Sequence, residues 1–494
     1  MLRASLARAP QGVGRRMTTA AAQQATKKEG DISDAFVSLS GVDRPPLPDR
    51  FRQLKCDLVR GREAEIKHSW TRLLGELRRE NDVIAAKGPA VIPQVEYKDL
   101  EAGIDGLQAE IRKRGAVVVR GVVPAGEARA YKEEAEEYIA KNPATRAFPQ
   151  HDPQVYELYW SAPQLKARSH PALLDVQRQL MARLWHTSSA TARISLDHPL
   201  TYADRLRIRQ PGDAAFALGP HMDGGSVERW EPAGYGRGAV YDAVFAGRWE
   251  DYDAWDAGGR VSAVNNLYEG LGPCTMFRAW QGWLSMSATR PREGTLLVKP
   301  LVQLSTAYVL LRPFFEAGAA AVGSPGYLDA ANWRFTGVDA MTSELQGATP
   351  GTGQELNDEL HPHLELERSM VHVPEIGPGD YVAWHCDTIH SVDRVHVGTG
   401  DSSVLYIPVC PTTELNAAYA ARQRSAFRAG TPGPDFPGGD GEARHVDRPS
   451  EEMLRRWGGD AGARAMGLEP QDVNAGMMAG PREAVERANA VLGF

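Results

Sequence analysis

Two histidines and an aspartate stand where this chain could hold a metal ion. His221 and Asp223 are two residues apart in LGPHMDGGSVERW, so at the end of an extended strand their side chains face the same side. His390 lies at the end of PGDYVAWHCDTIH, in which a Pro-Gly-Asp turn begins a strand. Two imidazoles and one carboxylate occupy one face of an octahedron and leave three positions open, which suits non-haem Fe(II) oxygen chemistry. These three residues are our candidates for metal ligation and catalysis.

Short strands have to position these residues. From Leu200 to Pro411 the chain alternates strand-like runs with turns rich in Gly, Pro and Asp. The runs that we expect to be strands cover residues 204–213, 294–311, 370–385 and 402–410. Many short strands with regular turn signals predict a β-sandwich or a barrel.

Helices are expected on both sides of this β-rich region. Apolar residues recur at helical spacing over 52–81, 124–140 and 171–193. Between the first two of these patterns, the run RKRGAVVVRGVV at 112–123 predicts a strand. After Ala429 a Pro/Gly-rich stretch leads into short helices, one of which begins with Ser450 as its N-cap. The sequence therefore predicts an α+β protein with a helical N-terminal layer and a helical C-terminal appendage.

Composition narrows the classes of function. The 494 residues carry 56 Lys and Arg against 63 Asp and Glu, a formal net charge of −7, which argues against nucleic acid as the main partner. No window is long and apolar enough for a transmembrane helix, so we expect no membrane partner. The four cysteines are too scattered for a disulfide framework or a CxxC zinc site, which favours a reducing compartment. We expect a small-molecule substrate, and the sequence gives no indication of oligomeric state.

The first 30 residues differ from the rest of the chain. They carry arginines and lysines, no acidic residue before Glu29, and apolar residues at helical spacing. This pattern is typical of a mitochondrial presequence, and its alternative is a disordered basic tail. The predicted location is therefore mitochondrial or cytoplasmic.

Three motifs together carry a family resemblance. YADRLRIRQPGD with LGPHMDGGSVERW, MFRAWQGWLSMSATRPREGTLLVKPL, and GDYVAWHCDTIHSV resemble the fungal and bacterial family known as domain of unknown function 1479, within the Fe(II)/2-oxoglutarate-dependent oxygenases. The resemblance implies a double-stranded β-helix (jelly-roll, cupin-like) core that uses Fe(II), 2-oxoglutarate and O2. The spacing from Gly-Asp to the distal histidine is similar to the phytanoyl-CoA hydroxylase branch, which implies His390 and not His385 as the third ligand.

The predicted domains follow from these features. They are 1–30 as presequence or tail, 31–199 as the helical layer, 200–428 as the oxygenase core with an inserted loop at about 316–370, and 429–494 as linker and short helices.

One departure from the superfamily concerns the co-substrate. The basic residue that usually binds the distal carboxylate of 2-oxoglutarate is missing, because GDSSV occupies the expected window at 400–404. Arg205, Arg207 and Arg209 alternate along one strand and share a face. By resemblance to the DNA-dealkylase branch, Arg207 and Arg209 hold the positions that present polar side chains to 2-oxoglutarate, and a guanidinium matches a carboxylate in bidentate fashion.

Other residues are weaker candidates for the co-substrate or substrate site. Ser402 and Ser403 could donate to the carboxylate in place of the missing base. Trp280, Gln281 and Trp283 could line the pocket, although tryptophans at this spacing also fit a strand core. Asn265 and Asn266 could bind substrate or form a turn.

Two other readings remain open. His361, His363, Glu367 and His385 resemble a cupin-type metal set, in a protein that could be an enzyme or a binding protein. The third possibility is a catalytically silent protein of the same fold that binds a small acid. The intact set His221, Asp223 and His390 argues against that loss.

Overall fold

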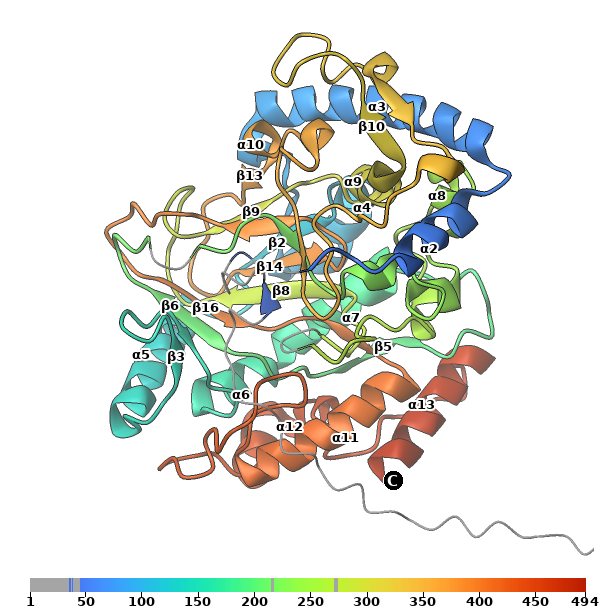
Figure 1. Ribbon diagram of the computed structural model, residues 1–494. Helices are drawn as coiled ribbons and strands as arrows, with labels where there is room; N and C mark the ends of the chain where they lie inside the picture. Colours follow the sequence, from blue (N-terminus) through green and yellow to red (C-terminus); the bar gives the residue numbers. More distant parts are fainter. Residues whose placement is uncertain (1–34, 37, 39–44, 215–216, 271–273) are drawn as a thin grey trace, which may run out of the picture.

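Two antiparallel sheets form the centre of the computed structural model, which describes residues 35–36, 38, 45–214, 217–270 and 274–494 (Figure 1). The larger sheet has eight strands, and every neighbouring pair is antiparallel except β1 and β2. Its order is β1 (Gln94–Glu96), β2 (Ala116–Arg120), β14 (Tyr381–His385), β8 (Trp280–Ser285), β16 (Ser402–Tyr406), β6 (Leu206–Arg209), β4 (Val155–Tyr156) and β3 (Ala147–Phe148).

The second sheet has five strands and carries the candidate metal ligands. Its order is β12 (Gln354–Glu355), β7 (His221–Met222), β15 (His390–Val392), β9 (Leu296–Val298) and β13 (Val371–His372). Two strand pairs complete the β-structure: β10 (Phe315–Ala317) with β11 (Trp333–Phe335), and β5 (Ser195–Leu200) with β17 (Cys410–Thr412). The two larger sheets bring together strands that lie far apart in the sequence.

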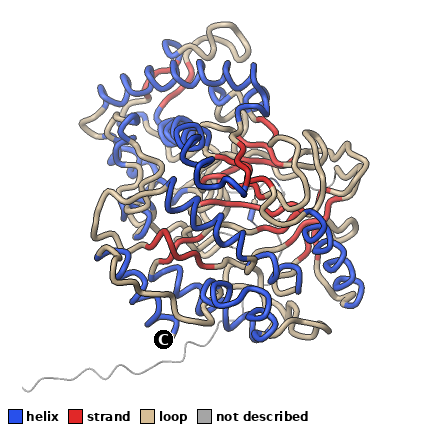
Figure 2. The backbone as a smooth tube through the Cα atoms, turned by 180° about the vertical axis from the view of Figure 1, so that it is seen from behind, coloured by secondary structure: helices blue, strands red, loops and turns tan. Residues whose placement is uncertain are grey.

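Helices surround the sheets, as the view from behind also shows (Figure 2). They are α2 (Arg50–Val59), α3 (Glu63–Lys87), α4 (Leu100–Arg114), α5 (Ala125–Lys141), α6 (Ala162–Arg168), α7 (Pro171–Leu184), α8 (Asp242–Phe245), α9 (Val302–Leu311), α10 (Leu366–Ser369), α11 (Glu414–Ala429), α12 (Glu451–Ala465) and α13 (Ala479–Leu492). The last three lie together at the bottom of Figure 1 and share an apolar cluster with Tyr159 and Trp160. None of the described helices has the length and apolar composition needed to cross a membrane.

Local sequence signals explain several of these boundaries. Pro124 directly precedes α5, and the hydroxyl of Ser450 accepts a hydrogen bond from the Met453 amide at the start of α12, as expected of an N-cap. Helix α4 ends at Gly115, whose φ of +63° suits glycine. A Cβ at Gly115 would lie 2.8 Å from Thr388 Oγ1, so only glycine lets α4 end against the β14–β15 connection. This contact helps to fix the strand that carries His390.

Parts of the secondary-structure prediction were wrong. The run 294–311 is not one strand, because β9 is followed by the helix α9, most of whose residues are buried. An apolar segment that is buried all around has no periodicity that separates helix from strand. The segment 31–199 contributes strands β1–β4 to the larger sheet in addition to its helices, and α11 (Glu414–Ala429) crosses the boundary expected at 428 by one residue. Strands of two or three residues are too short to show alternation. The predicted presequence at 1–30 lies outside the described residues.

Candidate metal centre

The pairing of β7 with β15 brings the three candidate ligands together. His221 and His390 are directly opposite each other in the ladder, and their ring centroids are 4.1 Å apart. Asp223 directly follows β7, with its carboxylate oxygens 3.6 Å from His221 Nε2 and 3.9 Å from His390 Nε2. One ligand atom from each residue lies within 4.8 Å of the other two. This spacing allows one ion to contact all three.

Backbone carbonyls orient both imidazoles. His221 Nδ1 is 2.8 Å from the carbonyl oxygen of Gly219, and His390 Nδ1 is 3.0 Å from that of Thr388. A carbonyl can only accept, so each Nδ1 carries the proton and each Nε2 keeps a free lone pair. Burial lowers the pKa of His390 to about 3, which keeps it neutral. Burial alone would raise the pKa of Asp223, but the neighbouring His221, His390 and Arg278 outweigh it and lower that pKa to about 2.

The two glycines after Asp223 make room for protein and not only for a ligand. Gly224 and Gly225 have φ of +77° and +90°, where glycine is favoured. A Cβ at Gly225 would lie 2.7 Å from the carbonyl oxygen of Asn265, and one at Gly224 would lie 3.1 Å from the Tyr235 hydroxyl. The loop that carries Asp223 therefore packs tightly against Tyr235 and Asn265.

A buried charge network braces the ligand-bearing segments. Arg229 Nη2 donates to the backbone carbonyl of Asp223 at 2.5 Å, and its Nη1 donates to Asp387 Oδ1 at 2.8 Å. Arg260 Nη2 pairs with the other oxygen of Asp387 at 2.5 Å. Asp387 directly precedes Thr388, whose carbonyl orients His390. The network therefore links the loop after β7 to the β14–β15 connection.

A cavity of about 140 Å³ lies between the two sheets and reaches the ligand set; we call it the Trp283 cavity. The larger sheet contributes Gln281, Trp283, Trp384 and Tyr406, and the smaller sheet contributes His221, Leu296 and His390. Buried donors without an acceptor among the described residues surround it: Gln281 Nε2, Trp283 Nε1 and Trp384 Nε1.

The strand that carries the three arginines runs along the interior. Arg205 lines the Trp283 cavity, and its only described hydrogen-bond acceptor is Asp204, at 3.2 Å from Nε. Arg207, two residues further along the strand, is fully buried. Its guanidinium lies 4.8 Å from the centroid of the Trp283 ring. Its Nη2 donates to the Gly294 carbonyl and lies 3.4 Å from Ser402 Oγ, whereas Nε and Nη1 have no partner among the described residues. Arg207 lies outside the lining of the Trp283 cavity.

Arg209, by contrast, is occupied by the protein itself. Its Nε pairs with Asp213 at 2.5 Å, and its terminal nitrogens donate to the carbonyls of Asp213, Asp393 and Arg394. Each of its three nitrogens thus donates to the protein, and four of its five N–H groups are used. Ser402 Oγ donates to the Gly294 carbonyl at 3.0 Å, and Ser403 Oγ donates to Asp401. These side chains hold strands together.

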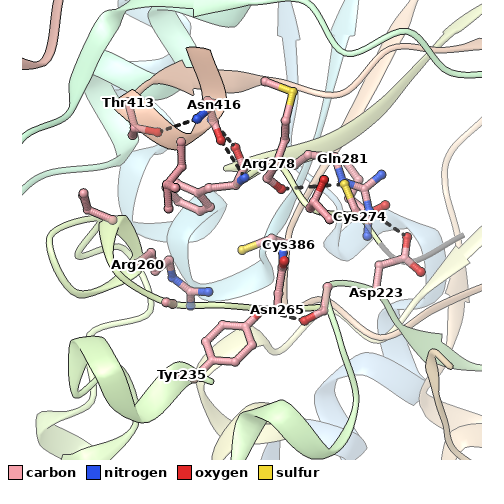
Figure 3. Close-up of a pocket in the computed structure, with 17 residues that line it drawn as sticks. Asp223, Tyr235, Arg260, Asn265, Cys274, Arg278, Gln281, Cys386, Thr413 and Asn416 are labelled. Atoms are coloured by element: carbon pink, nitrogen blue, oxygen red, sulfur yellow. Dashed lines mark hydrogen bonds and ion pairs between the residues drawn. The ribbon is translucent and has the colours of Figure 1, made fainter. Parts of the chain in front are cut away.

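A second cavity opens on the Asp223 side of the ligand set (Figure 3). Its lining includes Tyr235, Arg260, Asn265 and Cys386, and we call it the Arg260 cavity. It shares Asp223, Cys274, Arg278 and Gln281 with the Trp283 cavity. Arg278 stands between the two, with its Nη2 3.3 Å from Asp223 Oδ2. Burial raises the pKa of the Cys386 thiol to about 12, so it is not an activated nucleophile.

The other residues predicted for the site divide into core or turn residues and residues that line a cavity. Trp280 is a fully buried core residue, and the centroid of its ring lies 5.0 Å from that of Trp255. The Asn266 side chain accepts from the Gly270 amide, which makes it a turn residue, while Asn265 lines the Arg260 cavity. Gln281 lines both cavities.

The described structure does not bring the cupin-type set together. His385 is stacked on Trp185 at 4.8 Å and hydrogen-bonds to the Ala254 carbonyl. His363 contacts Trp70 and Trp333, on a different side of the fold, and Glu367 is exposed. His385, Cys386 and Asp387 also lie close together, but Asp387 is already paired with two arginines.

Sequence reasoning missed four residues of this region: Arg229, Arg260, Arg278 and Asp387. Arg229 and Arg278 stand inside the quoted motifs HMDGGSVERW and MFRAWQGW, so their position beside the candidate ligands was a usable signal. Asp387 likewise stands inside the quoted motif GDYVAWHCDTIHSV, three residues before His390. Arg260 lies in none of the quoted motifs, and its role depends on connections that only the folded chain brings together.

Comparison with known proteins identifies a family and relatives, both by sequence and by structure. A profile of the family described as Gig2-like matches residues 45–468. The chain is 31% identical over 415 residues to the uncharacterized protein YbiU of Escherichia coli (strain K12), which covers 81% of this chain and 92% of YbiU. Among solved structures it is similar to GlcNAc Inducible Gene 2, GIG2 (DUF1479), from Candida albicans, with TM-score 0.76, 31% identity, and coverage of 92% of this chain and 97% of that one. It is also similar to the solved structure of a protein from Salmonella typhimurium LT2 that is named provisionally as an oxidoreductase. The TM-score is 0.71 at 30% identity, and the match covers 86% of this chain and 99% of that one.

Proposed function

The chain belongs to the Gig2-like family (DUF1479), and from this premise we propose that it is a non-haem Fe(II)/2-oxoglutarate-dependent dioxygenase acting on a small molecule. The observation that carries the proposal is the convergence of His221, Asp223 and His390, with both Nδ1 atoms held by carbonyls. Such a set leaves open positions on an iron ion for a chelating co-substrate and O2. The provisional name of the Salmonella relative points to the same broad class.

We interpret the two facing sheets as the halves of a double-stranded β-helix. In support, the strands of His221 and His390 are neighbours in one sheet, and β8, β14 and β16 face them across the Trp283 cavity. This arrangement puts the ligand set at the boundary of an enclosed space between the sheets. A reactive oxidant needs such a space, because water and side reactions are kept away.

The Trp283 cavity fits 2-oxoglutarate by the chemistry of its lining. Arg205 lines it with terminal nitrogens that have no described acceptor, and the Tyr406 hydroxyl has no described partner either. We assign the distal carboxylate of 2-oxoglutarate to Arg205 and Tyr406. Arg207 lies behind the Trp283 ring and is the second candidate, and we do not assign Arg209 because its Nε is paired with Asp213.

When bound, Fe(II) and 2-oxoglutarate would supply the oxidising power by coupling the oxidative decarboxylation of 2-oxoglutarate to O2 activation. The protein's own side chains have three tasks. His221, Asp223 and His390 present one ligand atom each, and the carbonyls of 219 and 388 fix the imidazoles. Trp283 and Trp384 exclude water, while Arg205 balances carboxylate charge.

The first test is succinate formation from 2-oxoglutarate when O2 is admitted to anaerobic, Fe(II)-loaded protein without added substrate. We expect slow turnover that a His390→Ala variant loses. His151→Ala is the matched control, because His151 is exposed. The visible absorption that 2-oxoglutarate develops on Fe(II) is measured in parallel and should vanish in His390→Ala. Absence of both signals in the iron-bound wild type would contradict the proposal.

A further inference from the structure

The Arg260 cavity lies beside the ligand set but outside the space assigned to 2-oxoglutarate. Asp223 and Arg278 stand at the end that it shares with the Trp283 cavity, and Arg260, Tyr235 and Cys386 form another part of its wall (Figure 3). It therefore reaches the candidate iron position from the Asp223 side. A substrate bound there would approach the metal without displacing the co-substrate.

The side chains that line this cavity carry a net positive charge when the Asp223 carboxylate binds a metal ion. Asp223 is the only acidic residue of its described lining, against two guanidiniums, Arg260 and Arg278. Arg260 shares its partner Asp387 with Arg229, so one carboxylate serves two arginines. Arg260 Nε is buried and has no acceptor among the described residues.

Arg278 is the side chain best placed to receive an anion. Its described hydrogen bonding is a single contact of 3.3 Å from Nη2 to Asp223 Oδ2. The side chain lines both cavities and is only 11% exposed, so it has little access to bulk water. A largely desolvated guanidinium with free donors binds a carboxylate strongly.

Away from Arg278 the lining is mixed, with Thr275, Thr413 and Asn416 beside apolar side chains. Val261, Ala263 and Phe277 are half-buried, and Leu415, at the start of α11, is 57% exposed. These residues mark where the cavity meets solvent. The cavity thus combines a cationic inner end with an apolar mouth.

We propose that the oxidised substrate is a small carboxylic acid whose carboxylate binds Arg278 inside the Arg260 cavity, which measures about 40 Å³, and whose apolar part extends toward its mouth along Val261, Phe277 and Leu415. The proposal rests on the proposed function. The C–H bonds next to the carboxylate are then nearest the metal. One oxygen atom of O2 enters such a bond to give a hydroxy acid, and the other enters succinate as 2-oxoglutarate loses CO2. Of the four electrons that reduce O2, two come from 2-oxoglutarate and two from the C–H bond.

The test uses the full chain loaded with Mn(II) and saturated with N-oxalylglycine, an isostere of 2-oxoglutarate. The probes are isobutyrate and isobutyramide, which match in shape and differ in charge. Paramagnetic relaxation of their methyl protons by Mn(II) measures binding near the metal without any turnover. We expect saturable relaxation of isobutyrate and at least about tenfold weaker binding of isobutyramide.

Two sets of variants locate the binding. Arg278→Gln should remove the preference for isobutyrate, whereas Arg237→Gln, which removes an exposed charge, should keep it. The matched pair Leu415→Asp and Leu415→Asn changes only the exposed mouth and leaves the core intact. We expect Leu415→Asp to weaken the binding of isobutyrate several-fold at low salt and to leave the binding of isobutyramide unchanged. Leu415→Asn should change the binding of neither probe.

Each failure has its own signature. Equal relaxation of the two probes, or none, with N-oxalylglycine bound overturns the carboxylic-acid proposal and leaves the proposed function standing. Loss of N-oxalylglycine affinity in Arg278→Gln, with the preference for isobutyrate retained, assigns Arg278 to the co-substrate and also overturns it. If N-oxalylglycine does not change the Mn(II) signal of the wild type, the proposed function itself fails.

Discussion

The buried carboxylate of Asp387 offers the sharpest test of how the metal centre is held. Arg229 and Arg260 pair with it at 2.8 and 2.5 Å, and the hydroxyls of Tyr241 and Tyr252 lie 3.2 Å away. Burial opposes its charge, but the two arginines outweigh burial and hold the pKa of Asp387 far below its usual range. Replacement by asparagine, Asp387→Asn, keeps the size and removes the charge.

The expected magnitude follows from what the variant leaves behind. Two buried guanidiniums lose their shared counter-charge, which costs about 3–5 kcal/mol of unfolding free energy. The metal centre loosens as well, because Arg229 holds the Asp223 carbonyl and the next residue, Thr388, orients His390. Disrupting such supporting contacts lowers metal affinity by about 10–100-fold.

The assay combines urea unfolding of the metal-free protein with calorimetric titration of Mn(II). Asp339→Asn, at an exposed position, is the matched control. The double variant Asp387→Asn with Arg260→Gln restores the net charge of the network and should recover part of the stability. The reasoning is refuted if Asp387→Asn unfolds within about 1 kcal/mol of wild type with unchanged Mn(II) affinity, or if the double variant recovers nothing.

Three further outcomes are expected. Arg205→Gln should weaken 2-oxoglutarate binding to the Mn(II) protein by at least about tenfold without unfolding it. Arg209→Gln should instead cost about 3–5 kcal/mol of stability, because it breaks the buried ion pair with Asp213. Equal 2-oxoglutarate affinity in Arg205→Gln and wild type would contradict the assignment. Burial raises the pKa of Glu442 from its ordinary value of 4.5 to about 7, so the stability that its neutral form contributes is present below pH ~4.5 and is lost as the pH rises through 7. Glu442→Gln should therefore gain on the order of 3 kcal/mol relative to wild type between pH 5 and pH 8 in urea unfolding, and parallel pH profiles would refute this. Chelation of iron should stop succinate formation and added Fe(II) should restore it, while Asp223→Ala should lose both iron retention and turnover; an active chelated enzyme would rule out the metal.

The candidate ligands were predictable because their signal is local. An HxD at a strand end and a histidine after a Pro-Gly-Asp strand are patterns of a few residues, and strand alternation puts His221 and Asp223 on one side. The helices with clear periodicity or caps, such as α3 and α12, were predictable for the same reason. The family resemblance was also carried by short motifs, and the match to the Gig2-like family confirms it.

Other features depended on residues that are distant in the sequence. Sequence alone could not separate Arg205, Arg207 and Arg209, which alternate on one strand; only the packed sheets show that Arg209 is paired with Asp213 while Arg205 faces the Trp283 cavity. Nor could it show that Asp387 joins the two ligand-bearing segments through Arg229. The residue types and short spacings thus determined which atoms could bind a metal. The tertiary structure decided which charges are satisfied and which remain free for a ligand, because a side chain's partners are set by the segments that pack against it.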